Sequence, residues 1–315
     1  MLSRAPEAPV RDYYCDSAHW ERFTPRDGDV IIATAPKVGT TWTQQIVNLL
    51  VFQNAEPRHL GMLSPWLDCR LQMPLEMALQ VLEAQPHRRF IKSHLPMSAL
   101  PLWDEVRYIH VARDGRDACM SYLNHVNGYT PFTWSKLDEI GERDPLLPGP
   151  KPRPPRTTRE FFHHWIGEGG TRKAELMADA FFEIERSFWA VRALPNVLLL
   201  HYADMKADLD GEMRRIAAFL DIPVDEAIWA SLVAAADFSA MRRDGETLMA
   251  GIDVAFEGGH ETFLNKGTNG RWQGELTPED LALYQNRVET ELSPDLALWL
   301  EQGRRGAGDP RGGGA

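Results

Sequence analysis

Short motifs in this chain carry residue types that can bind phosphate and move a proton. Residues 35–42 read Ala-Pro-Lys-Val-Gly-Thr-Thr-Trp, follow an apolar run and lead into a helical pattern. A turn of this kind aims backbone N–H groups and the positive end of a helix dipole at an anion. Lys37 precedes Gly39 by two residues, whereas the lysine of an ATP-binding loop directly follows its second glycine. The segment therefore predicts a phosphate-ester site unlike that of an ordinary NTPase.

A second motif, residues 92–96, reads Lys-Ser-His-Leu-Pro and ends another apolar run. The ordinary pKa of histidine is near neutrality, so His94 can accept a hydroxyl proton at working pH. Lys92 lies two residues earlier, on the same side of an extended chain, and can add a second cation near Lys37. Taken singly, a lysine or a histidine is more often a surface or structural residue. Their placement at the ends of neighbouring strands favours a shared site.

Two later segments can also bind phosphate. An ATPase needs an aspartate at a strand end to organise magnesium, but here Arg113 stands at that place, and Ser121 follows two helical turns later. A guanidinium matches the geometry of phosphate oxygens, and a hydroxyl can share them. The alternative is a surface ion pair of Arg113 or Arg116 with Asp117. The Gly-rich segment 263–272 can wrap a second phosphate with its N–H groups, or it is only a flexible loop.

The elements that must position these residues follow a strand–helix alternation. Apolar runs at 30–34, 89–93, 106–112 and 197–201 predict strands buried on both faces of a parallel sheet. The expected helices are 40–52, 74–84, 115–124, 159–177, 182–193, 208–220, 225–236 and 278–292. This pattern predicts an α/β fold in three layers, with a central parallel sheet flanked by helices. Ligands of such sheets gather at the carboxyl ends of the strands, where the motifs fall.

The chain organisation fits one large domain over residues 1–303. A Gly-rich tail, 304–315, is expected to be disordered. The Pro-rich segment 144–155 cannot be helical and is expected to be extended or mobile. Residues 242–270, rich in Gly and charge, are expected to form a second long loop, of the kind that often serves as a lid.

Composition limits the class of partner. The formal charge of −11 argues against nucleic acid as a ligand, because backbone binding needs a broad basic surface. A nucleotide remains possible, since it needs only local cations. The three cysteines, Cys15, Cys69 and Cys119, have no metal-ligand spacing and suit a reducing compartment. No apolar stretch is long enough to span a membrane, so a cytoplasmic location is expected.

Together the four motifs resemble the PAPS-dependent cytosolic sulfotransferase family, and among its members the bacterial ones. They occur in family order: residues 35–42, residues 92–96, the pair Arg113 and Ser121, and the block Lys266-Gly-x-x-Gly-x-Trp272. A softer match is His-Tyr-Ala-Asp-Met-Lys after the fourth strand, and the resemblance covers roughly residues 20–300. It implies one α/β domain related to P-loop kinases, 3′-phosphoadenosine 5′-phosphosulfate (PAPS) as donor, and no metal.

The resemblance also implies roles for individual residues. His94 would take the acceptor proton, Lys37 would face the leaving phosphate oxygen, and Lys92 would face the sulfonate oxygens. The implied catalytic set is His94, Lys37, Lys92 and Ser121. The 5′-phosphate would lie on Thr40, Thr41 and the loop backbone, the adenine between aromatic rings, and the 3′-phosphate on Arg113, Ser121 and the last block. The implied donor-binding set is Lys37, Val38, Gly39, Thr40, Thr41, Trp42, Arg113, Ser121, Tyr202, Phe238, Asn265, Lys266 and Gly267.

The sequence departs from the family pattern in four places. Val38 stands where many members carry serine, and Ala236 replaces a hydroxyl often found near the adenine. Asn265 occupies the usual position of an arginine, so Arg271 is a candidate replacement for the missing cation. Residues 273–282 keep only one residue of the family dimer motif, and this leaves the oligomeric state open.

The sequence thus predicts a sulfotransferase that acts on a hydroxyl of a phenol, an alcohol or a glycolipid. The alternatives are a P-loop small-molecule kinase and a catalytically silent nucleotide-binding protein. The acceptor is expected under the segments 62–73, 124–155 and 242–263, whose large side chains suit a flat or lipid-like molecule but can equally be core. These side chains are Trp66, Leu71, Met73, Tyr129, Phe132, Trp134, Met249 and Phe256.

Overall fold

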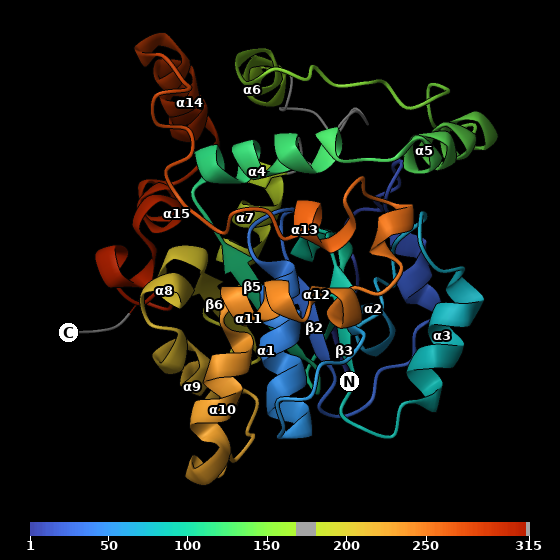
Figure 1. Cartoon of the computed structure of the whole chain (residues 1–315), viewed down its shortest axis with the longest axis vertical. Coiled ribbons are helices and arrows are strands. Elements are labelled where there is room, and N and C mark those ends of the chain that lie inside the picture. Colours follow the sequence, from blue (N-terminus) through green and yellow to red (C-terminus); the bar gives the residue numbers. More distant parts are fainter. Residues whose placement is uncertain (168–180, 313–315) are drawn as a thin grey trace.

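Four parallel strands form the centre of the computed structural model, which describes residues 1–167 and 181–312 (Figure 1). They are β2 (Val30–Ala33), β3 (Phe90–Ser93), β5 (Arg107–Ala112) and β6 (Val197–His201), in the order β3-β2-β5-β6. Nearly all their residues are buried, as expected for a parallel sheet covered on both faces. The predicted α/β class is confirmed, and each predicted strand is found to within one residue.

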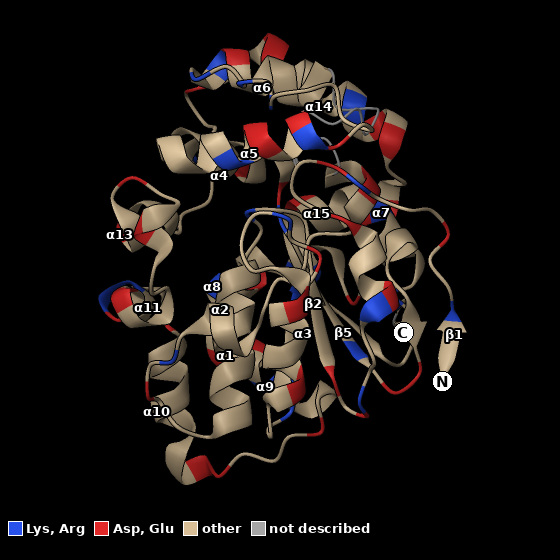
Figure 2. Ribbon diagram, turned by 90° about the vertical axis from the view of Figure 1, so that its right-hand side faces the viewer, with Lys and Arg blue, Asp and Glu red and all other residues tan. Residues whose placement is uncertain are grey.

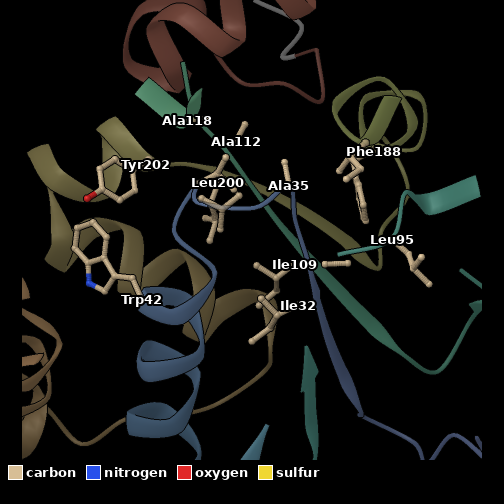
Figure 3. Close-up of a cluster of buried hydrophobic side chains, with 14 of the residues drawn as sticks. Ile32, Ala35, Trp42, Leu95, Ile109, Ala112, Ala118, Phe188, Leu200 and Tyr202 are labelled. Atoms are coloured by element: carbon tan, nitrogen blue, oxygen red, sulfur yellow. The ribbon is translucent and has the colours of Figure 1, made fainter. Parts of the chain in front are cut away.

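Helices cover both faces of the sheet and make the expected three layers. On one face, α1 (Thr40–Phe52) begins directly after the loop that leaves β2, close to Val111 of β5. On the other face, α7 (Phe181–Ala190) places Phe188 against His110 of β5, with ring centroids 4.2 Å apart. Alternate residues of one strand point to opposite faces, so β5 is packed from both sides. Figure 3 shows the apolar side chains that fill this region.

The other helices surround this core. They are η1 (Ser17–Arg22), α2 (Leu60–Leu63), α3 (Leu75–Ala84), η2 (Met97–Ala99), α4 (Gly115–Asn127), α5 (Pro131–Arg143), α6 (Thr158–Gly167), α8 (Tyr202–Ala207), α9 (Leu209–Phe219), α10 (Glu226–Ala236), α14 (Pro278–Glu291) and α15 (Pro294–Ala307). A small antiparallel pair, β1 (Leu2–Arg4) with β4 (Leu102–Trp103), stands apart from the main sheet. Most predicted helices are present, but residues 168–177 of the predicted helix 159–177 lie outside the described residues.

The Pro-rich segment 144–155 has no helix or strand, as predicted, yet several contacts fix its path. The Asp144 carboxylate accepts from Arg11 Nε and pairs with Arg70, each at 2.7 Å. The hydroxyl of Tyr13 donates to the Gly149 carbonyl at 2.8 Å. The segment therefore lies against the N-terminal part of the chain.

The prediction of one long loop over residues 242–270 is wrong in its details, because much of this segment folds into short helical turns. These are the end of α11 (Phe238–Arg243), α12 (Gly245–Leu248), η4 (Ile252–Val254) and α13 (Gly259–Phe263). Its hydrogen bonds to the segment after α4 include Thr130 N to Ala255 O at 3.1 Å and Glu257 N to Gly128 O at 2.8 Å. Tertiary contacts of this kind override the weak helix propensity of a Gly-rich sequence.

The expected start of the tail, residue 304, falls inside α15. Arg304 is fixed twice, since its backbone N–H donates to Asp204 at 2.6 Å and its guanidinium pairs with Glu212 at 2.8 Å. Positions of Asp, Glu, Lys and Arg recur along outer helices such as α5 and α14 (Figure 2). Across residues 1–167 and 181–312, no helix is long and apolar enough to cross a membrane.

Candidate active site

The loop between β2 and α1 has the backbone of an anion cradle. Lys37 has φ 67° and Gly39 has φ 123°, and no side chain caps the N-terminus of α1. The first N–H groups of a helix lack intrahelical acceptors, so this end can hold an anion. The hydroxyls of Thr34 and Thr40 lie 2.6 Å apart beneath the loop. Val38 is fully buried in the core, so its side chain turns away from the cradle and the loop N–H groups remain.

Lys37 is a cation that packs on an aromatic ring. Its Nζ lies 4.4 Å from the ring centroid of Phe263 and donates to the Phe263 carbonyl at 3.4 Å. No ion pair joins it to a carboxylate in the part of the chain that the structure describes. Burial, together with the positive charges of Lys92 and Arg113, lowers the pKa of Lys37 to about 7. An anion placed here would restore the charged form.

His94 is held in one tautomer by a backbone carbonyl. Its Nδ1 lies 2.8 Å from the Thr34 oxygen, which can only accept, so Nδ1 carries the proton and Nε2 is left with its lone pair. Burial and the Lys92 charge hold the pKa of His94 well below its usual value of 6.5. The ring is therefore neutral at physiological pH and can act as a base.

Trp66 links His94 to Lys92. Its ring stands edge-on to His94 with centroids 4.7 Å apart, and Lys92 Nζ lies 4.3 Å from the same indole. Three donors converge on the buried Asp68: Trp66 Nε1 and Ser93 Oγ at 2.6 Å, and Trp20 Nε1 at 2.9 Å. Asp68 thus fixes the indole that positions the imidazole. No motif in the sequence marks this carboxylate.

Arg113 lies on the far side of the cradle. Its guanidinium donates to the carbonyls of Lys37 at 3.0 Å and Thr268 at 2.9 Å, and lies 4.2 Å from the Tyr202 ring. The predicted alternative, pairing of Arg113 or Arg116 with Asp117, is wrong, because Arg116 pairs with Asp114 instead.

The last motif folds onto this arginine. Asp117 accepts from the N–H groups of Gly270 at 3.0 Å and Arg271 at 3.1 Å, and so fixes the loop. Gly267 has φ 62°, and a Cβ there would lie 2.8 Å from the Phe238 ring, so only glycine fits. The side chain of Lys266 is exposed and that of Asn265 is half-buried. The Arg271 charge contributes to the lowered pKa of both Lys37 and Arg113, so Arg271 belongs to the positive charge of this region.

Aromatic rings pack beside the start of α1. Trp42 and Tyr202 meet with centroids 5.4 Å apart, and the Trp42 indole donates to the Ala236 carbonyl at 2.7 Å (Figure 3). Thr41 and Ser121 are half-buried, and Ser121 lies one helical turn beyond Asp117 on α4. The structure therefore brings residues of all four motifs to the carboxyl edge of the sheet.

A second aromatic cluster lies on the other side of Lys37. The His125 ring contacts Phe256 at 4.7 Å, Tyr129 at 5.1 Å and Phe263 at 5.6 Å. Among the acceptor residues expected from the sequence, Trp66, Tyr129 and Phe256 join these clusters, whereas Phe132 is 52% exposed. Sequence reasoning missed His125, although its spacing of four from Ser121 indicates the same helix face.

Comparisons with known proteins agree with this geometry. The family model of the sulfotransferase domain matches residues 27–294. A protein of Mycobacterium bovis named glycolipid sulfotransferase is 35% identical over 311 residues, 94% of each chain. Mouse sulfotransferase 1B1 is 26% identical and aligns with 84% of this chain and 83% of its own.

Solved structures share the fold. Retinol dehydratase in complex with androsterone and the inactive cofactor PAP has a TM-score of 0.68 at 24% identity, covering 92% of this chain and 88% of its own. A mouse sulfotransferase in complex with PAP has a TM-score of 0.65 at 20% identity, covering 90% of each chain. With the family model and the mycobacterial relative, these findings exclude the kinase alternative: the chain belongs to the sulfotransferase family and is a sulfotransferase.

Proposed function

We propose that this enzyme transfers the sulfuryl group of PAPS to a hydroxyl of a lipid-like acceptor, of the kind that a glycolipid carries. The observation that carries the proposal is the convergence of Lys37, Lys92 and Arg113 without an ion-paired carboxylate among the described residues. Cations that are partly or fully removed from water, as Lys37, Lys92 and Arg113 are, are costly unless an anion compensates them, so this arrangement suits a ligand with several phosphate charges. The name of the mycobacterial relative and the PAP complexes of the structural relatives support the same donor and acceptor class.

The donor would lie along the carboxyl edge of the sheet. The uncapped start of α1, with Thr40 and Thr41, suits the 5′-phosphate. Trp42, Tyr202 and Phe238 offer rings for the adenine. We assign the 3′-phosphate to Arg113, Ser121 and the segment 265–267. The Arg113 guanidinium donates to the carbonyls of Lys37 and Thr268, which a phosphate would replace.

The reaction would need one proton transfer and one in-line displacement. His94 Nε2 takes the proton of the acceptor hydroxyl, whose oxygen forms the new O–S bond. The bond between sulfur and the bridging phosphate oxygen breaks, and the electron pair stays on that oxygen beside Lys37. Lys92 faces the sulfonate oxygens, and His94 then releases its proton to solvent. Because charge grows on the leaving oxygen, a fixed cation there lowers the barrier more than it aids binding.

Direct transfer tests the proposal. We expect purified protein with ³⁵S-labelled PAPS to label hydroxyl acceptors from a panel of phenols, alcohols and glycolipids, and PAP to raise the melting temperature. Host-cell extract incubated with the protein and ³⁵S-labelled PAPS should contain the natural acceptor in sulfated form, and mass spectrometry of the labelled products identifies it. A PAP-induced shift without transfer to any acceptor would instead favour a catalytically silent protein, and no shift at all would reject PAPS as the donor.

A further inference from the structure

His125 is a polar side chain in the site that the reaction described above does not use. It lies on α4, one helical turn after Ser121 and two after Asp117, so the three share the face turned toward the site. Burial, together with the charges of Lys37 and Lys92, holds the pKa of His125 well below 6.5. The imidazole is therefore neutral, and it shares the Phe263 ring with Lys37: the His125 and Phe263 centroids lie 5.6 Å apart, and Lys37 Nζ lies 4.4 Å from the Phe263 centroid.

Its hydrogen-bonding capacity is unused. The Nδ1 atom is buried without a partner, and neither ring nitrogen forms a hydrogen bond to any residue in 1–167 or 181–312. A neutral imidazole has one donor and one acceptor, and leaving the buried Nδ1 unpaired is unfavourable. The surroundings are rings: Phe256, Tyr129 and Phe263 at 4.7 to 5.6 Å, with Tyr122 stacked at 5.8 Å. These walls would exclude water once an acceptor is bound.

The cavity next to Tyr129 is lined by both aromatic and charged side chains. The same tyrosine lines an open cavity of about 680 Å³ together with Asn127, Trp134, Arg153 and Glu257. The Trp134 indole nitrogen is also buried, and it has no hydrogen-bond partner among the residues that the structure describes. A hydrocarbon chain here would desolvate Glu257 and the Arg153–Asp138 ion pair, whereas a sugar offers hydroxyls to them and C–H faces to the rings.

We propose that His125 hydrogen-bonds a second hydroxyl of the acceptor, so that the site selects a sugar ring with neighbouring hydroxyls over a molecule with a single one. This inference rests on the proposed function and narrows its acceptor class. His94 activates one hydroxyl, and His125 recognises another on the same ring. A site that hydrogen-bonds a substrate group discriminates strongly against the analogue that lacks it, because its own polar group is then left unpaired.

The test compares two acceptors that differ in hydroxyl number on a six-membered ring: octyl β-glucoside and 4-octylcyclohexanol. We expect the wild-type kcat/KM to be at least about tenfold higher for the glucoside. His125→Phe should lower that value about tenfold, mainly through KM, and leave the cyclohexanol unchanged, while His125→Gln should retain part of the preference. Both variants should bind PAP as the wild type does.

The control is His87→Phe. His87 also packs on an aromatic ring, with its centroid 4.8 Å from that of Phe52, but it precedes β3 and so lies at the amino end of that strand, away from the site. Equal kcat/KM for the two acceptors in the wild type, or an equal loss for both in His125→Phe, would overturn the inference while transfer itself continues. Transfer to neither acceptor would count against the proposed function. Should His125→Phe fail to fold, the wild-type preference and His125→Gln still decide the question.

Discussion

The ammonium of Lys37 lies over the ring of Phe263, 4.4 Å from its centroid, with Lys92 and Arg113 as its charged neighbours. Its pKa is about 7 before an anion binds, and an anion beside it raises that value. The charged form is therefore present in the free protein below about pH 7, and binding above that pH must take up a proton.

We accordingly expect the affinity for PAP to fall as pH rises from about 7 to 9. Calorimetry at pH 8 in buffers of different ionisation heat should show net proton uptake. Lys37→Ala should abolish most of that uptake and lower kcat about 10²- to 10³-fold, whereas the surface change Lys136→Ala should do neither. Identical binding heats in all buffers would contradict this role of Lys37.

His94→Ala should remove turnover by at least about 10²-fold and leave PAP binding intact, since a general base contributes on that scale. Because the pKa of His94 is well below 6.5, the base form persists in mild acid, and the acid limb of kcat/KM should lie below pH 6.5. The alkaline limb should follow deprotonation of Lys37 near pH 7. His87→Ala serves as the control. Near wild-type rates in His94→Ala would remove it from the base role.

Arg271 is expected to replace the cation that Asn265 lacks. Arg271→Ala should weaken PAP about tenfold, and Asn265→Arg should strengthen it by a similar factor, because a charge-assisted contact to phosphate is gained or lost. Adenosine 5′-phosphate, which lacks the 3′-phosphate, should bind equally to all three proteins. If either change altered the affinity for both nucleotides equally, Arg271 would not act on the 3′-phosphate.

Asp68→Ala should lower the free energy of unfolding by about 3–5 kcal/mol, since buried donors from Trp20, Trp66 and Ser93 lose their acceptor. Urea denaturation measures this, with exposed Asp27→Ala as a control expected to stay within about 0.5 kcal/mol. Activity should fall as well, because Trp66 would no longer hold His94. A stable variant with full activity would show that Asp68 positions nothing.

Much of this arrangement could be predicted from the sequence, because local patterns encode it. The apolar runs located the four strands, and the loop Pro-Lys-Val-Gly with its hydroxyls located the start of α1. Asp68 could not be recognised, since its three donors come from separate segments that only the fold brings together. The short helical turns within residues 252–263 could not be predicted either, because they depend on hydrogen bonds to the segment after α4.

The backbone of Lys37 has a consequence for protein engineering. With φ 67°, it occupies a conformation that glycine or asparagine adopts more readily, and its ammonium pairs with no carboxylate in the described part of the chain. A redesign guided by thermostability alone would therefore replace this lysine early and count the change as an improvement. Mutant libraries made to raise the thermal stability of the enzyme should keep Lys37 unchanged. They should be screened for product formation, so that stability is not gained by losing activity.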